Sequence, residues 1–195
     1  MDIKIALGTL AVVIGLLGYV FYIRGILKGE VKPHAFTWSV WGILTSIAFV
    51  AQVIDGGGPG AWVTGATAFM SFIFAMVGLG ATSRIYIKKN DWILFVFTLL
   101  AIPVWFVTEN PLWAVIIITI IDAVAFAPTF RKAFHHPETE NVWTYLFSGT
   151  KFVFGIVALE SLTLTTILYP ASLVLANGAF VAMVLWRKKY LQEKF

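Results

Sequence analysis

The chain has 195 residues, of which 59% are hydrophobic and only 12% are charged. Soluble domains average about 25% charged residues, so this composition excludes an ordinary soluble protein and indicates an integral membrane protein. The net charge of +4 does not indicate a nucleic-acid partner, because the basic residues stand at the ends of apolar runs. The chain contains no cysteine, which excludes disulfide bonds, thiolate metal sites and cysteine nucleophiles.

Taken in chain order, the apolar runs predict seven transmembrane helices, because a bilayer core takes about 20 apolar residues per helix. Short connectors that contain proline, glycine or charged residues separate the runs. The first run lacks a cleavage site of the A-x-A type, so we interpret it as a retained helix. The expected spans are residues 5–23, 36–54, 61–82, 92–108, 111–130, 142–160 and 165–186.

The distribution of lysine and arginine predicts the orientation of these spans. The connectors DGGGPG, TEN and ESLT carry no basic residue, and Lys4 is the single basic residue on their side of the membrane. By the positive-inside rule, we expect a multi-pass protein of the plasma (inner) membrane with its N-terminus outside and its C-terminus in the cytoplasm. The basic residues expected on the cytoplasmic side are Arg24, Lys28, Lys32, Arg84, Lys88, Lys89, Arg131, Lys132, Arg187, Lys188, Lys189 and Lys194.

An internal repeat is indicated when the chain is compared with itself at an offset of 107 residues. The stretch FYIRGILKGEVKPHAFTWSV, residues 21–40, then lies over PTFRKAFHHPETENVWTYLF, residues 128–147, without a gap. Arg24 falls on Arg131, and each stretch contains a helix end, a basic loop and the start of the next helix.

The repeat predicts an all-α architecture of two parallel three-helix bundles joined by one inverting helix. The first unit is expected over residues 1–89, the linker helix over 90–108, and the second unit with a basic tail over 109–195. Parallel repeats of this kind are a transporter architecture, in which the substrate binds near the membrane midplane between the halves.

This arrangement resembles the SWEET/PQ-loop superfamily, whose motif after the first helix of each repeat is a proline-glutamine pair followed by a basic residue. In PTFR, residues 128–131, Pro128 and Arg131 match the motif and Thr129 replaces glutamine. The first repeat has FYIR at the same place, so that only the basic residue, Arg24, matches. The resemblance implies a fold that serves sugar, vitamin-precursor and amino-acid transporters and also a sorting receptor.

Two charged residues interrupt the apolar helices, and we expect them to form an ion pair. Asp122 lies about 12 Å from the cytoplasmic end of its span, and Lys151 about 15 Å, at 1.5 Å per residue. A lone charge at the centre of a membrane helix costs about 2.5–3.5 kcal/mol on insertion scales, which a partner at the same depth would largely offset. Such a pair would either fix the packing of two helices or belong to a transport path or proton relay. Alternatively, Lys151 extends toward the interface and Asp122 is neutral.

A substrate site is expected near the midplane. The resemblance implies a substrate contact for Asn177, because SWEET-like transporters use an asparagine in the third helix of a repeat. The corresponding position of the first unit, Met70 or Ser71, does not reproduce the asparagine, so the pocket would be asymmetric. We expect Asn177, Trp41 and Ser71 to approach a shared midplane space between the halves. Asn177 is equally suited to a hydrogen bond between helices.

The second span carries further candidate binding residues. Trp41, Thr45 and Gln52 share one helical face, and a tryptophan with polar neighbours suits a sugar or a planar ligand. Trp38 and Trp41 lie close to the cytoplasmic boundary, where tryptophan is also common as an interfacial residue.

These features favour a transporter or facilitator for a polar metabolite (sugar, amino acid or vitamin-like) that works by alternating access. A non-transporting membrane receptor or assembly subunit is the alternative on the same fold. The expected partners are the lipid bilayer and a small polar substrate, and the sequence is compatible with a homo-oligomer. His34, His135 and His136 are interpreted as loop residues, and no enzyme motif occurs, so we expect no enzymatic activity, metal, cofactor or nucleic acid.

Overall fold

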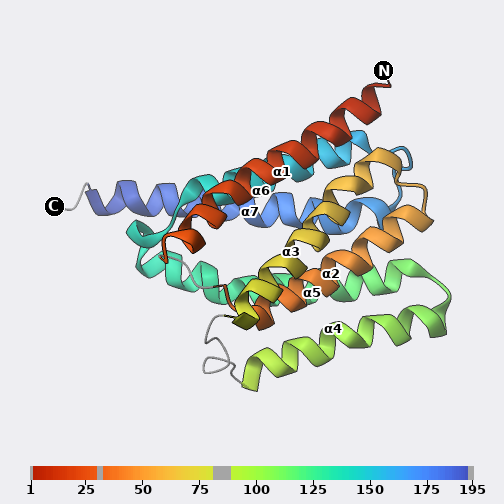
Figure 1. The fold of residues 1–195 in the computed structure, drawn as a ribbon, viewed down its shortest axis with the longest axis horizontal. Coiled ribbons are helices and arrows are strands. Elements are labelled where there is room, and N and C mark those ends of the chain that lie inside the picture. The colour runs from red at the N-terminus through yellow and green to blue at the C-terminus, as the bar shows by residue number, and fades with distance from the viewer. Residues whose placement is uncertain (1, 30–32, 81–88, 193–195) are drawn as a thin grey trace.

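The computed structural model describes residues 2–29, 33–80 and 89–192, and all regular structure in these ranges is helical (Figure 1). The helices are α1 (Ile3–Leu27), α2 (Ala35–Ile54), η1 (Gly58–Ala61), α3 (Trp62–Gly80), α4 (Lys89–Thr108), α5 (Pro111–His135), η3 (Pro137–Thr139), α6 (Val142–Ala158) and α7 (Leu164–Gln192). Five of them, α1, α2, η1 with α3, α5 and α7, are long and apolar enough to cross a membrane, and α6 is a shorter apolar helix. The prediction of an all-helical chain with seven main helices is therefore confirmed for the described residues, and five of these helices have the length and hydropathy of the expected transmembrane spans.

Polar side chains fix where several helices begin. The carboxylate of Asp2 accepts a hydrogen bond from the backbone N–H of Lys4 at 2.9 Å. The amide oxygens of Asn110 and Asn141 likewise accept from the backbone two residues further on, at 2.9 and 3.1 Å. Each of these bonds satisfies one of the N–H groups that a helix start leaves without an intrahelical partner.

Three helices continue beyond the spans that hydropathy predicts. α1 ends at Leu27, α5 at His135 and α7 at Gln192. The turns beyond the predicted spans contain basic residues, so hydropathy alone does not include them in the spans. The predicted connector after residue 130 is thus largely helical, and η3 follows it. The basic tail is also helical as far as Gln192, and the Nε of Arg187 donates to the carbonyl of Phe134 at 3.0 Å. Four of the basic residues used for orientation, Lys32, Arg84, Lys88 and Lys194, lie outside the described residues, as do positions 81 and 82 of the third predicted span.

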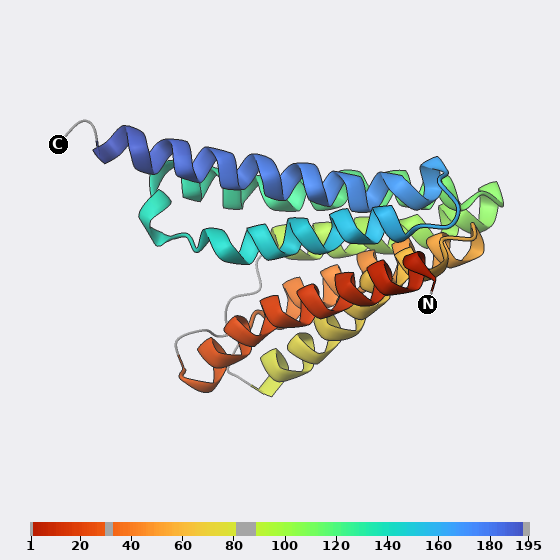
Figure 2. The ribbon, with the colours of Figure 1, turned by 90° about the horizontal axis from the view of Figure 1, so that it is seen from above.

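The packing of the helices places two groups side by side. α3 packs on α1 and α2, and α7 packs on α5 and α6. Between the groups, α1 contacts α6 and α2 contacts α5, while α4 covers α5 and α2. The two chain termini lie at opposite ends of the bundle, which we call its N-terminal end and its C-terminal end (Figure 1). Figure 2 shows that α1 and α3 approach α6 and α7 at the N-terminal end and diverge from them toward the C-terminal end.

At the N-terminal end, residues 55–61 interlock with residues 155–163, and we call this contact the N-terminal seal. The backbone N–H of Glu160 donates to the carbonyl of Gly57 at 3.2 Å, and that of Ser161 donates to the carbonyl of Gly56 at 3.2 Å. A Cβ atom on Gly60 would lie 2.5 Å from the backbone nitrogen of Leu159. The absence of a side chain at this glycine is therefore what permits the two backbones to meet.

Lys4 completes the N-terminal seal. Its Nζ donates to the carbonyls of Val157 and Leu159 at 2.9 and 2.6 Å, at the end of α6. A cation at a helix C-terminus satisfies free carbonyls and interacts favourably with the helix dipole. Lys4 thus has a structural role at the N-terminal end of the bundle.

The seal predicts that Gly60→Ala lowers the free energy of unfolding by about 1–3 kcal/mol, the usual cost of overpacking. The matched control is Gly178→Ala in α7, because a Cβ there would meet nothing within 4 Å. Thermal unfolding in detergent should show a lower midpoint for the first variant and no loss for the second. Equal midpoints would contradict the close backbone contact.

The bundle also predicts that Leu162, in the connector before α7, and His135, at the end of α5, lie on opposite sides of the membrane. Single cysteines at these two exposed positions can be labelled in an otherwise cysteine-free chain. We expect a membrane-impermeant maleimide to label Leu162→Cys from outside intact cells and His135→Cys only after permeabilisation. Labelling of both from one side would refute this topology.

Candidate functional site

A cavity of about 340 Å³ lies between the two groups of helices. It extends from Thr144, an exposed residue near the start of α6, to Phe152 and Tyr169, which are fully buried. Pockets for small ligands commonly measure about 300–1,000 Å³, so this space suits a small solute. The polar residues in its wall are Tyr19, Tyr22, Trp38, Trp41, Thr45, Thr67, Ser71, Asp122, Thr144, Tyr145, Ser148, Lys151, Tyr169, Ser172 and Asn177.

Lys151, the tenth residue of α6, is buried, with 4% of its surface exposed. Its Nζ donates to the Oγ1 of Thr67 at 3.0 Å and to the hydroxyl of Tyr19 at 3.2 Å. The ammonium also lies 4.9 Å from the ring centroids of Tyr19 and Phe152, within cation–π range. A Cβ on Gly15 would stand 3.1 Å from the Cδ of Lys151, so this glycine of α1 leaves room for the lysine stem. One side chain thus joins α6 to α1 and α3.

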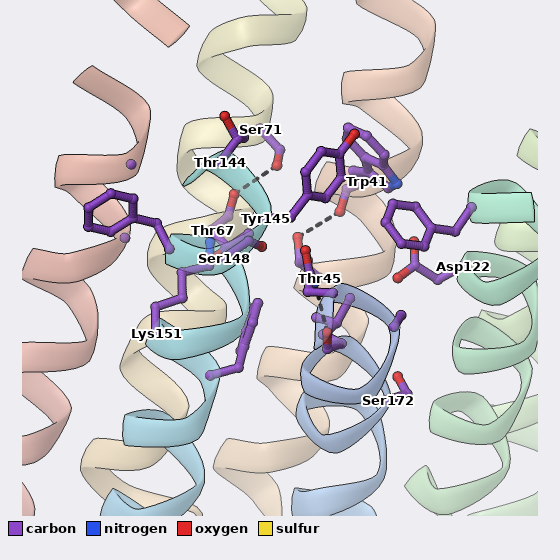
Figure 3. A pocket seen from close by; sticks show the side chains of 18 of the residues that line it. Trp41, Thr45, Thr67, Ser71, Asp122, Thr144, Tyr145, Ser148, Lys151 and Ser172 are labelled. Atoms are coloured by element: carbon purple, nitrogen blue, oxygen red, sulfur yellow. Dashed lines mark hydrogen bonds between the residues drawn. The ribbon is translucent and has the colours of Figure 1, made fainter. Parts of the chain in front are cut away.

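Asp122 projects from α5 on the other side of the cavity (Figure 3). The side chain is partly buried, and Trp41 of α2 is its hydrogen-bonding partner. Tyr169 of α7 lies close enough to interact with the carboxylate electrostatically. Asp122 is therefore surrounded by α2 and α7, whereas Lys151 is surrounded by α1 and α3.

The expected direct ion pair between Asp122 and Lys151 is not formed. Both residues line the cavity, but no salt bridge joins them among the residues that the structure describes. The expectation depended on similar depths along the two helices, and depth does not determine the direction in which a side chain points. α6 packs on α1 and α7, whereas α5 packs on α2, α4 and α7, so the two charges are directed to different neighbours.

Four of the predicted binding residues lie in the wall of this cavity: Trp41, Thr45, Ser71 and Asn177. The hydroxyl of Thr45, the hydroxyl of Ser71 and the amide of Asn177 each donate to the carbonyl four residues earlier, at 2.6, 2.8 and 2.7 Å. Because the two hydroxyl donors are used within the helices, Thr45 and Ser71 offer a ligand their oxygen atoms as acceptors, whereas Asn177 offers its oxygen and one further N–H.

Gln52 does not belong to the cavity, contrary to the helical-face argument. It is fully buried beyond the cavity, and its Nε2 donates to the carbonyl of Thr166 at 2.9 Å. The same face of α2 lines the cavity at Trp41 and Thr45 and then packs against the start of α7. A helical stripe can change its environment along its length, so that Gln52 supports the N-terminal seal instead.

Three residues of the proline motif, Thr129, Arg131 and Arg24, also lie outside the cavity wall. Pro128, Thr129 and Arg131 are within α5 and Arg24 is within the last turn of α1, rather than in loops after these helices. Arg24 and Arg131 are both exposed. Both helices continue past the motif, which explains the difference.

Several residues of the site were not identified from the sequence. Tyr19 and Thr67, the partners of Lys151, come from helices far away along the chain, and only the four-residue spacing of Thr67 and Ser71 on α3 signals a polar stripe. Trp38, considered an interfacial residue, lines the cavity and donates from its Nε1 to the hydroxyl of Tyr22 at 2.9 Å.

Comparison of the chain with family models, with curated proteins and with solved structures found no match. Within the described part of the chain, no group of three histidine, aspartate or glutamate side chains is arranged to hold a metal ion. The cavity and the two charges in its wall are therefore the features of this chain that indicate a function.

The bonds of Lys151 predict a specific cost for Thr67→Val. The variant leaves a buried ammonium without one of its acceptors, and hydrogen bonds to charged groups contribute about 1.5–3 kcal/mol. Thr119→Val is the matched control, because the hydroxyls of Thr67 and Thr119 both donate to the carbonyl four residues earlier at 2.7 Å and both side chains are partly buried. Thermal unfolding in detergent should show the larger loss for Thr67→Val, and equal losses would mean that the lysine contact contributes nothing.

Proposed function

We propose that this chain is a small membrane transporter or facilitator that moves a polar solute through the cavity. The observation that carries the proposal is a solute-sized cavity with two opposite charges in its wall, enclosed by apolar helices. Ionisable residues inside membrane helices usually mark a substrate or ion pathway, because their insertion is costly. A cavity lined by both charges and hydroxyls offers a polar solute partners that the bilayer lacks.

Two parallel three-helix units around the cavity are part of this proposal. At the offset of 107 residues, Ala35 at the start of α2 falls on Val142 at the start of α6, and Leu27 at the end of α1 falls one residue before the end of α5. The packing has the same correspondence, since α3 packs on α1 and α2 as α7 packs on α5 and α6. These relations support a repeat with α4 as the linker, and they agree with the resemblance to the SWEET/PQ-loop architecture.

The proposed mechanism is alternating access between two ends of the bundle. The N-terminal seal closes one end, and the cavity reaches an exposed residue, Thr144, toward the other. Arg24, Arg131 and Arg187 lie at the C-terminal end, which by the positive-inside rule faces the cytoplasm of a plasma (inner) membrane protein. The described conformation then corresponds to a state that is open to the cytoplasm.

A receptor or assembly subunit on the same fold remains the alternative function. A scaffold gains stability from close packing of its interior, at the density of an organic crystal. A cavity of about 340 Å³ with a buried lysine in its wall would lower the stability of such a scaffold. This feature favours transport over a purely structural role.

Transport through the cavity predicts that Ala176→Phe abolishes uptake. Ala176 lines the cavity, and its neighbour Leu175 is 73% exposed on the outer surface of α7, so Leu175→Phe adds a similar ring without filling the space. In proteoliposomes with a panel of amino acids, peptides, sugars and nucleosides, we expect uptake by the parent chain and Leu175→Phe. Uptake by Ala176→Phe should fall at least tenfold while its thermal midpoint stays close to that of the control. Uptake that is insensitive to Ala176→Phe, or no uptake of any solute by the parent chain, would contradict the proposal.

A further inference from the structure

The cavity contains a buried cation that has only neutral partners. Lys151 donates to two hydroxyl oxygens, and an ammonium has three N–H groups. No carboxylate forms a salt bridge with it among the described residues. Removing an ammonium from water costs several kcal/mol, which neutral hydroxyls and ring faces offset only in part. An anionic group delivered by a ligand would supply what Lys151 lacks.

Asp122 is the opposite case on the facing side of the same cavity (Figure 3). A carboxylate can accept several hydrogen bonds, and Trp41 is its one side-chain donor in the described ranges. No lysine or arginine pairs with it within those ranges. A cationic group of a ligand would complete this site as well.

We propose that the cavity binds a linear zwitterion, with its carboxylate at Lys151 and Tyr19 and its ammonium at Asp122. The inference depends on the proposed function in that it names the class of solute that the same cavity accepts. A zwitterion supplies both missing counter-charges and brings no net charge into the membrane. A simple anion would leave Asp122 without a cation and would be repelled by it, and a simple cation has the same difficulty at Lys151.

The geometry favours a ligand whose charges are at opposite ends. Lys151 and Asp122 do not contact each other and stand on opposite sides of the cavity, with Thr45 and Trp41 between them (Figure 3). A dipeptide or an ω-amino acid separates its charged groups, whereas an α-amino acid holds them on one carbon atom. Aromatic side chains also line the cavity, including Trp38, Phe126 and Phe147, and they suit an apolar or amide segment.

The test is a binding measurement on the full-length protein in detergent, by isothermal titration calorimetry. The probes are leucyl-alanine, its C-terminal amide, its N-acetyl derivative, leucine and glucose. The parent chain should bind the dipeptide, and removal of either charge should weaken binding by about tenfold or more, because each removes a charged hydrogen bond. Leucine and glucose should bind more weakly than the dipeptide.

Two variants show which end of the ligand meets which residue. In Lys151→Gln, the dipeptide should bind no better than its amide, while the penalty for N-acetylation persists. In Asp122→Asn, the dipeptide should bind no better than its N-acetyl derivative, while the penalty for amidation persists. This crossed pattern cannot result from general destabilisation. If Lys151→Gln does not fold, Thr67→Val can be used in its place. This variant should reduce the preference for the dipeptide over its C-terminal amide without changing the effect of N-acetylation.

The inference would be overturned by variants that weaken all probes equally, by an amide or N-acetyl derivative that binds the parent chain as well as the dipeptide, or by tighter binding of leucine or glucose. Failure of the proposed function gives a different result. Sugar uptake that Ala176→Phe blocks, without binding of any zwitterion, would refute the ligand class and leave transport intact. The crossed pattern without uptake of the dipeptide would support the ligand class and refute transport.

Discussion

The hydrogen bonds of Lys151 determine how the two groups of helices meet. A lysine in the middle of a bundle needs acceptors, and Tyr19 and Thr67 supply them from α1 and α3. Gly15 leaves space for the lysine stem where α1 passes α6. These partners are neutral hydroxyls, and no salt bridge joins Lys151 to a carboxylate among the described residues, so the wall of the cavity beside this side chain is polar. An apolar residue at this position would allow the helices to close around it.

The two ends of the interface are therefore built from different chemistry. At the N-terminal end, glycines let backbones touch, and backbone hydrogen bonds join residues 55–61 to residues 155–163. Toward the C-terminal end, aromatic and hydroxyl side chains line a cavity with Asp122 and Lys151 on facing walls. One end of the cavity is therefore closed, and the other can be reached from outside the bundle. A transporter that works by alternating access needs this asymmetry in each of its conformations.

The sequence predicted the features that depend on local composition and helical spacing. Seven apolar runs correspond to the seven main helices, and Trp41, Thr45, Ser71 and Asn177, which were expected near the midplane, line one cavity. Features that depend on the rotation of one helix against another were not predicted. Similar depth suggested that Asp122 and Lys151 pair, but their helices are turned to different neighbours. For the same reason Gln52 was assigned to the site, and the partners of Lys151 were missed.

The central claim is that polar residues keep one end of this interface open while the other is sealed. Ser148 lines the cavity on α6, and a single cysteine there can be tested in a chain without other cysteines. In membrane vesicles of known orientation, Ser148→Cys should react with a small membrane-impermeant thiol reagent added on the side of His135, and much more slowly from the side of Leu162. No reaction from both sides would show that side chains fill the space. Faster reaction from the side of Leu162 would show that the open end of the cavity is on that side. Either result would contradict the account.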